Sequence, residues 1–324
     1  MPRTTANLPL IGVVLGVLVF AALPLVLPTY QVSVATRILI FSLLAVSIDV
    51  LAGYAGRTPL GHGAIFGVST YVTIHWVTVM GGSPWVGMLL GVGAATAVAA
   101  VFALLAVRTS GVYFLLLTLA LGMIVWGVCL RWSTVTGGEN GMRGSVRPAA
   151  LASQVGFYYA VLVIVLLATF LVWRLVHSPF GLTLRGIRES ESRMRALGYN
   201  VPLHLFLAFT LSGTAAGVAG AVYALFNEFV SPTTVSLAQS VQGLLMAIVG
   251  GVGTLLGGFI GAAAIIVLEN TVSFYTERWQ TVMGLMFVLL MIFAPEGVIG
   301  RGLLLLRQRR TAIPQPQQEG STEG

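Results

Sequence analysis

Apolar residues occur along the chain in long blocks rather than in an alternating pattern. Six such runs precede the main polar segment, and each is close to the about 20 residues that a helix needs to cross a bilayer. They cover Leu8 to Leu27, Val34 to Ala52, Leu60 to Met80, Val86 to Val107, Tyr113 to Leu130 and Val155 to Val176. The first run lacks an A-x-A cleavage pattern and is long for a signal sequence, so we expect an uncleaved span.

Three further apolar stretches follow the polar segment His177 to Pro202. They are Leu203 to Phe226, Val241 to Leu268 and Thr281 to Ala294. We expect the second to form two short segments that turn near its glycines, although a re-entrant hairpin is an alternative. The prediction is an all-α polytopic membrane protein with about ten transmembrane segments, some of them broken by glycine.

Composition supports a membrane protein and excludes several chemistries. Of 324 residues, 8% are charged, against about 25% in soluble domains, and mean hydropathy is +0.94. Every basic residue is arginine, which excludes a Walker A ATPase and a lysine Schiff base. The single cysteine, Cys129, and four scattered histidines form no metal-binding motif. We expect no cofactor, no metal and no nucleic-acid partner.

The arginines predict the orientation. One cluster surrounds the polar segment (Arg174, Arg185, Arg188, Arg193, Arg195), and another follows the last run (Arg301, Arg307, Arg309, Arg310). The positive-inside rule places both clusters and both termini in the cytoplasm. Exceptions are Arg278 and the loop from Arg131 to Gln154. We therefore expect a transmembrane domain over residues 1–310, with a cytoplasmic loop at 177–202, and a disordered cytoplasmic tail at 311–324.

The polar segment has an amphipathic pattern. Residues Gly181 to Gly198 predict a three-turn helix, with Ile187, Met194 and Leu197 on one face and Gly198 as its C-terminal stop. Such a helix suits a partner protein, and it also suits the lipid surface.

Two glycine-rich segments predict discontinuous helices. Gly53 to Gly67 contains five glycines and Pro59, and a second cluster lies within Gly250 to Gly261. Backbone groups freed by such breaks can line a midplane pathway, whereas close helix packing through small residues is the alternative. The candidate pathway residues are Gly53, Tyr54, Gly56, Gly61, His62, Gly63, Gly250, Gly251 and Gly253.

Ionisable residues within apolar runs are also candidates. Asp49 is expected either to reach the interface or to cap nearby backbone, and His62 either to approach the pathway or to hydrogen-bond between helices. We expect Arg37 to extend toward the interface. The loop Thr136 to Gly144 is a connector or a contact surface for a soluble partner.

Five ordered segments together resemble the LivM-like permease subunits of branched-chain amino-acid ABC importers. They are Gly53-Tyr-Ala-Gly-Arg-Thr-Pro-Leu-Gly-His-Gly63, Gly111-Val-Tyr-Phe-Leu-Leu-Leu-Thr-Leu-Ala120, Thr136-Gly-Gly-Glu-Asn-Gly141, Ser178-Pro-Phe-Gly-Leu-Thr-Leu-Arg-Gly-Ile-Arg-Glu-Ser-Glu191 and Ala294-Pro-Glu-Gly297. The resemblance implies a second homologous permease, two cytoplasmic ATPase subunits and an extracytoplasmic binding protein as partners in a bacterial-type inner membrane. Arg57-Thr58-Pro59 stands where the family often has a glutamine-leucine-serine-type sequence.

The resemblance also implies a role for the polar segment, because Arg185 to Gly198 is similar to the coupling helix that contacts the ATPase. The coupling residues are then Arg185, Gly186, Ile187, Arg188, Glu189, Glu191, Met194, Ala196, Leu197 and Gly198.

The expected function is a non-enzymatic permease subunit that imports branched-chain or related hydrophobic amino acids by alternating access. A permease for urea or short amides is an alternative within the same family. An ion-coupled secondary transporter would use Asp49, His62 or Glu269 instead. A membrane enzyme would need a cluster of catalytic groups, which the sequence does not display.

Overall fold

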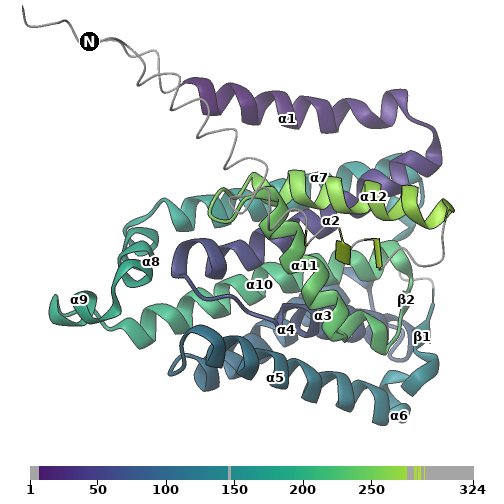
Figure 1. The fold of residues 1–324 in the computed structure, drawn as a ribbon. Coiled ribbons are helices and arrows are strands. Elements are labelled where there is room, and N and C mark those ends of the chain that lie inside the picture. The colour runs from purple at the N-terminus through teal and green to yellow at the C-terminus, as the bar shows by residue number, and fades with distance from the viewer. Residues whose placement is uncertain (1–6, 145–146, 276–280, 283, 286–287, 289–324) are drawn as a thin grey trace, which may run out of the picture.

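The computed structural model describes residues 7–144, 147–275, 281–282, 284–285 and 288, and it is predominantly helical. The long helices run back and forth along one direction, so the bundle has two ends (Figure 1). They are α1 (Asn7–Val26), α2 (Thr29–Asp49), α3 (His62–Thr78), α4 (Pro84–Ala106), α5 (Gly111–Arg131), α7 (Gln154–Val176), α10 (Val201–Asn227), α11 (Leu237–Gly250) and α12 (Gly257–Tyr275). A π-helical turn, Val50–Ala55, continues α2.

The short elements lie at the two ends of the bundle. At one end, which we name the α8–α9 end, are α8 (Pro179–Glu189) and α9 (Glu191–Ala196). At the other, which we name the strand end, are α6 (Ser133–Thr136) and the antiparallel strands β1 (Met142–Arg143) and β2 (Phe229–Val230), with Met142 opposite Val230. Short 3-10 turns cover Gly138–Asn140, Ala149–Leu151 and Pro232–Val235.

The predicted apolar runs up to Leu268 are confirmed as helices with boundaries shifted by a few residues. Within the described residues, six helices are long and apolar enough to span a membrane: α2 with its π-helical turn, α4, α5, α7, α10 and α12. The stretch Val241 to Leu268 contains two separate helices, α11 and α12, joined by a turn at 251–256 near the predicted glycines, an arrangement shared by the two-segment interpretation and the re-entrant hairpin. Most of the expected span Thr281 to Ala294 lies outside the described residues. Arg278, the arginines from Arg301 onward and the tail 311–324 also lie outside them.

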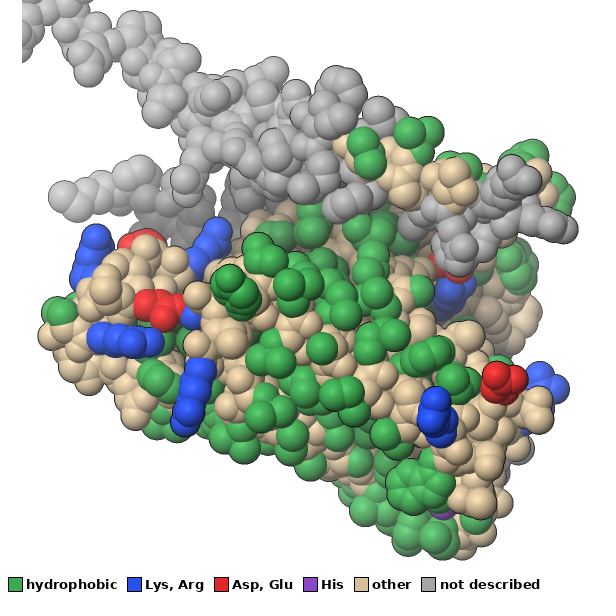
Figure 2. All heavy atoms as spheres, turned by 60° about the horizontal axis from the view of Figure 1, so that its bottom comes forward, with side chains coloured by type: hydrophobic (Ala, Val, Ile, Leu, Met, Phe, Trp, Pro, Cys, Tyr) green, Lys and Arg blue, Asp and Glu red, His purple; other side chains and the backbone are tan. Residues whose placement is uncertain are grey.

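Helix α2 forms the centre of the bundle. In the most apolar 18-residue stretch of α2 and its π-helical turn, 94% of the residues are buried. In the corresponding stretches of α4, α5 and α7, only 22–33% of the residues are buried. A helix that is apolar all round belongs in a core, and one with an exposed apolar face suits a lipid environment. Figure 2 shows such apolar side chains between charged side chains at the two ends.

Small residues bring neighbouring helices close together around this core. A Cβ at Gly217 of α10 would lie 2.6 Å from the Cβ of Ala95 in α4, and one at Gly243 of α11 would lie 2.9 Å from the side chain of Ile48. Close packing through small residues replaces the hydrophobic driving force that helices lack in lipid.

The prediction of one continuous helix from Gly181 to Gly198 is wrong. Ser190 has an extended backbone (φ −162°, ψ 105°), which ends α8 and starts α9. The Ser190 hydroxyl accepts a hydrogen bond from the backbone N–H of Arg193 at 3.3 Å and thereby caps α9. As a result Ile187 and Met194 are buried, but Leu197 is 66% exposed. Gly198, with φ +86°, ends α9 as predicted.

Candidate functional site

Helix α8 packs on the end of α2, where the π-helical turn Val50–Ala55 ends. Its apolar side, which includes Leu184 and Ile187, is buried against the bundle. The Arg188 guanidinium donates a hydrogen bond to the carbonyl oxygen of Gly53, and the Arg185 guanidinium lies 5.0 Å from the centre of the Tyr54 ring. Two arginines of α8 therefore hold the last turn of α2.

The local backbone explains why this turn accepts an arginine. A π-helical turn interrupts the regular i→i+4 bonding of a helix, and the helix ends at Gly56 with φ +67°. A Cβ on Gly56 would lie 2.8 Å from Cγ of Arg188, so glycine gives the arginine its path to the carbonyl of Gly53.

A second connection joins α9 to Arg57, which follows the same turn. Arg57 forms an ion pair with Glu191 and donates a hydrogen bond to the carbonyl oxygen of Thr109, in the turn between α4 and α5. The Arg57 side chain is only 6% exposed and lies 5.8 Å from the centre of the Phe114 ring. Arg57, one of the three residues that depart from the resembled sequence, therefore links α9 to the bundle.

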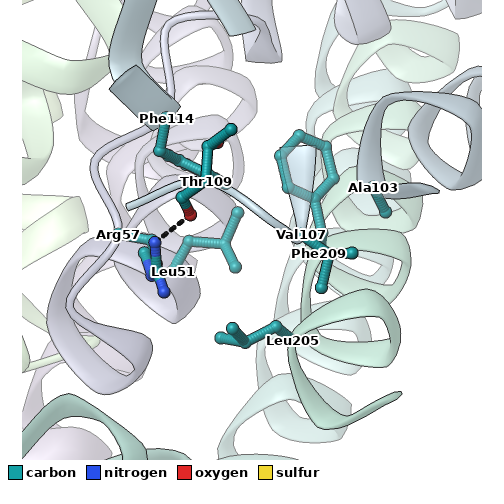
Figure 3. Close-up of a pocket in the computed structure, with 8 residues that line it drawn as sticks. All are labelled: Leu51, Arg57, Ala103, Val107, Thr109, Phe114, Leu205 and Phe209. Carbon is teal, nitrogen blue, oxygen red and sulfur yellow. Dashed lines mark hydrogen bonds between the residues drawn. The ribbon is translucent and has the colours of Figure 1, made fainter. Parts of the chain in front are cut away.

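Beside Arg57 lies a small, mostly apolar cleft (Figure 3). Its other lining residues are Leu51, Ala103, Val107, Thr109, Phe114, Leu205 and Phe209. Arg57 is the single charged residue of this lining, and both Thr109 and Glu191 engage it.

The two glycine-rich segments meet at the end of α2. The backbone N–H of Gly253 donates a hydrogen bond to Oδ1 of Asp49, with N and O 2.6 Å apart. A Cβ on Gly53 would lie 2.5 Å from both of these atoms. Asp49 is 2% exposed. It thus caps a backbone group, which was one of the two expectations for it.

The other candidate pathway residues form a second group around the start of α3. The backbone N–H of Gly63 donates to the Ser240 hydroxyl of α11 at 2.9 Å, and Nε2 of His62 lies 2.7 Å from the Ser212 hydroxyl of α10. Leu60 N–H donates to the Thr118 hydroxyl at 3.0 Å. His62 is fully buried. In this conformation its side chain forms an interhelical hydrogen bond and does not face an open pathway.

The candidate pathway residues are therefore divided between two places. Gly53, Tyr54, Gly56 and Gly253 lie next to α8, whereas Gly61, His62 and Gly63 lie beside α10, α11 and the Phe102 ring. Gly250 and Gly251 are buried where α11 turns toward α12.

The coupling candidates occupy the α8–α9 end with different exposures. Ile187 and Met194 are buried, and Gly186 packs against Met194, since a Cβ there would lie 2.7 Å from its sulfur. Glu191 pairs with both Arg57 and Arg195, and its Oε2 lies 3.6 Å from Nη2 of Arg195. Exposed toward solvent are Arg185, Arg188, Glu189, Ala196, Leu197 and Gly198.

The expectation that Arg37 extends toward the interface is wrong. Its Nη2 lies 2.8 Å from Oε1 of Glu269 in α12, and Gln242 of α11 donates to the other carboxylate oxygen at 2.9 Å. A charge within an apolar span is costly unless it is paired, and α12 passes close enough to α2 to supply the partner.

At the strand end, the loop Thr136 to Gly144 folds onto the segment after α10. Gly137, Gly138 and Gly141 have positive φ, and the strand pair follows them. The guanidinium of Arg147 lies 4.3 Å from the centre of the Phe157 ring. The loop is thus a folded part of this end rather than an extended connector.

Sequence reasoning missed the hydroxyl partners Thr118, Ser212 and Ser240 and the carbonyl partner Thr109. Single Ser and Thr residues inside apolar runs commonly bond to their own helix, so nothing in the sequence distinguishes these hydroxyls. Within the described residues, no group of three His, Cys, Asp or Glu side chains is arranged to hold a metal ion.

Known proteins similar to this chain are transport permeases, not enzymes. LivM, the permease protein of the high-affinity branched-chain amino acid transport system of Salmonella typhimurium (strain LT2), is 26% identical over 305 residues, covering 86% of this chain and 72% of the relative. The probable branched-chain amino acid transport permease protein LivH of Methanocaldococcus jannaschii is 25% identical, covering 72% and 80%. The autoinducer 2 import system permease protein LsrC of Klebsiella pneumoniae is 30% identical, covering 61% and 59%.

No solved structure matches the chain. The family model described as the branched-chain amino acid transport system permease component matches residues 30–294, which include all of α2 except Thr29, the helices from α3 to α12, and every candidate site residue discussed above. The chain therefore belongs to the family of permease components of branched-chain amino acid transport systems.

Proposed function

We propose that the chain is the LivM-like permease subunit of an ATP-driven importer of branched-chain or related hydrophobic amino acids. Its partners would be a homologous second permease, two cytoplasmic ATPase subunits and an extracytoplasmic substrate-binding protein. The similarity to both LivM and LivH proteins supports a paired permease. Because the sequence has no lysine, a Walker A ATPase must be a separate subunit.

The arrangement of α8 and α9 carries this proposal. Both helices lie beyond the ends of the long helices and expose charged side chains. The arginine contacts join them to the turn that ends α2, and Ile187 and Met194 are buried. A surface that is exposed to a partner and bonded to the central helix is suited to pass a movement inward. Arg185 to Gly198 is accordingly the surface we assign to the ATPase.

The proposed topology has about ten spans with both termini in the cytoplasm. The antiparallel course of the helices and the enrichment of arginine at the α8–α9 end support it. Described arginines at that end are Arg57, Arg108, Arg174, Arg185, Arg188, Arg193 and Arg195, against Arg131, Arg143 and Arg147 at the strand end. The strand end would then face the binding protein.

The proposed pathway passes the two glycine-rich segments, Gly53 to Gly67 and Gly250 to Gly261, between the two permeases. Most residues of the first segment are buried here, as are Gly250, Gly251, Gly257, Gly258 and Gly261 of the second, which corresponds to a closed conformation. Rocking of the subunits would separate the groups around Gly53 and around Gly63 and give the substrate access to backbone.

The ion-coupled alternative has less support. It would use Asp49, His62 or Glu269 to carry a proton, and each of these side chains is bonded to a protein group: Gly253, Ser212 and Arg37 respectively. No observation favours the urea or short-amide alternative, which the experiment below also tests.

The test is purification of the full chain from its native membrane in detergent, followed by identification of co-purifying proteins and an ATPase assay. We expect a second permease and ATPase subunits, with hydrolysis stimulated by the binding protein loaded with leucine, isoleucine or valine but not with urea. A chain that purifies alone and transports when ATP is depleted would refute the proposal. If ATP hydrolysis were stimulated only by binding protein loaded with urea, the proposed class of substrate, hydrophobic amino acids, would be wrong.

A further inference from the structure

We infer that Asp49 transmits the movement of α8 to the turn between α11 and α12 (residues 251–256), which makes this turn a moving part of the transporter. The inference rests on the proposed function, since the ATPase subunits supply the movement. Asp49 is a positioning residue in this scheme and does not contact the substrate.

The first step joins α8 to the end of α2. The Arg188 guanidinium bonds to the carbonyl of Gly53, and Gly56 leaves room for the side chain along this path. In addition, the ion pair of Arg57 with Glu191 joins α9 to the residues that follow the π-helical turn. A displacement of α8 and α9 therefore acts on residues 53–57 at two points, the carbonyl of Gly53 and the side chain of Arg57.

The second step joins the end of α2 to the α11–α12 turn. Asp49 lies one helical turn before Gly53, and its carboxylate holds the backbone N–H of Gly253 at 2.6 Å. A hydrogen bond to an ionised or buried carboxyl is among the stronger polar contacts in a low-dielectric environment. Nη1 of Arg188 also lies 3.9 Å from the position of a Cβ on Gly253, so α8, α2 and the turn converge at one place.

The turn itself has the properties of a hinge. Gly251 and Gly253 have φ of +108° and +87°, and Val252 and Leu256 are 38% and 46% exposed. Apart from Asp49, the recorded polar contacts of the turn are local: the Thr254 hydroxyl donates to the carbonyl of Gly251 at 2.7 Å, and backbone hydrogen bonds join the turn to the adjoining ends of α11 and α12. Segments with few buried contacts and unusual backbone angles absorb movement readily.

The third step returns to the start of α3. Helix α11 carries Ser240, which binds the N–H of Gly63. A movement of the turn displaces α11 and with it this bond. Asp49 thus connects the two separate groups of candidate pathway residues, which share no direct hydrogen bond among the described contacts.

The test measures movement at the turn and at α9 separately in the complex that co-purifies with the full chain. Single cysteines at Leu256→Cys and Leu197→Cys, in a Cys129→Ala background, are labelled with a water-soluble maleimide with and without ATP and vanadate. In the otherwise unchanged chain, we expect nucleotide to change the labelling rate severalfold at both positions. With Asp49→Ala, the change should persist at Leu197→Cys and disappear at Leu256→Cys.

Asp49→Asn is the matched variant, because its amide oxygen still accepts the N–H of Gly253 and should restore the nucleotide response at the turn. A response at Leu256→Cys that survives Asp49→Ala overturns the inference, as does failure of Asp49→Asn to restore it in a complex that still assembles. Loss of the response at both positions in the unchanged chain would instead contradict the proposed function. Should Asp49→Ala fail to assemble, Gly53→Ala takes its place, because the added methyl group would separate Asp49 from Gly253; a nucleotide response at Leu256→Cys that survives Gly53→Ala overturns the inference.

Discussion

Two polar networks join α2 to the hairpin of α11 and α12, and they differ in what lies beyond them. Near the strand end, Arg37, Glu269 and Gln242 bond through side chains alone. Near the α8–α9 end, Asp49 bonds to the backbone of Gly253, and Arg188 bonds to the backbone of Gly53. The first network ends inside the bundle, whereas the second reaches an exposed helix pair. The first network is suited to holding the α11–α12 hairpin in place, and the second is suited to moving it.

The difference also appears in the residue types. Ion pairs between long side chains such as Arg37 and Glu269 persist when neighbouring residues change, because the long side chains can adopt other rotamers. Backbone contacts such as that of Asp49 require glycine, since a Cβ at Gly53 would lie 2.5 Å from Gly253 N. We therefore expect the first network to be replaceable by apolar residues, but the second to fail on the addition of one methyl group.

Glu269→Ala should have the largest effect on stability. It leaves Arg37, which is 29% exposed, without its carboxylate, and breaking a mostly buried ion pair costs about 2–4 kcal/mol. The measurement is thermal unfolding of the chain in detergent. The double variant Arg37→Met, Glu269→Leu should recover most of the stability and retain transport. Lost transport in a stable double variant would show that this network does more than fasten.

Gly53→Ala should abolish uptake while reducing stability by about 1–3 kcal/mol, the usual cost of overpacking. The new methyl group would separate Asp49 from Gly253. Uptake into vesicles containing the full complex is the readout. Gly93→Ala is the matched control, because a Cβ there meets nothing within 4 Å. Normal uptake by Gly53→Ala would contradict the importance of this contact.

Glu189→Arg should lower uptake by about tenfold or more through charge repulsion at the ATPase interface. Glu189 is an exposed residue at the end of α8, so the free energy of unfolding should change by about 0.5 kcal/mol or less. Co-purification of ATPase subunits measures the effect. Glu139→Arg reverses an exposed charge at the strand end and should leave this association intact. Equal association of both variants with the ATPase would argue against α8 as the interface.

Ser240→Ala should have the smallest effect on uptake among these variants. The change removes the hydroxyl that accepts the N–H of Gly63, and single hydrogen bonds between membrane helices contribute about 0.6 kcal/mol on average. Unfolding in detergent should detect a small loss, with uptake reduced but present. A loss comparable to that of Glu269→Ala would indicate that Ser240 supports more than one contact.

The sequence predicts the helices well, because a membrane span leaves a long and unambiguous apolar signal. The break between α11 and α12 was predictable from glycine spacing together with the parity that the arginine clusters require. The break at Ser190 was not, since a one-residue interruption leaves the apolar periodicity on both sides nearly intact. Local capping by the Ser190 side chain decides it.

The site was only partly predictable, because its contacts join distant parts of the chain. Arg57 and Glu191 are 134 residues apart, and Arg37 and Glu269 are 232 apart. The glycines and Asp49 could be identified as unusual within apolar runs, but their partners depend on how the helices pack. Arg37 shows this most clearly, since its expected course toward the interface assumed that no carboxylate lay nearby.

The most direct test of the coupling surface is crosslinking from α9 in native membranes. Leu197→Cys, in a Cys129→Ala background, would be treated with a short bifunctional reagent that joins its thiol to nearby lysine amines, and the adduct identified by mass spectrometry. The proposed function predicts an adduct with an ATP-hydrolysing subunit, formed to a different extent with and without nucleotide. Adducts only with lipid or with unrelated proteins, in membranes that still import the amino acid, would contradict it.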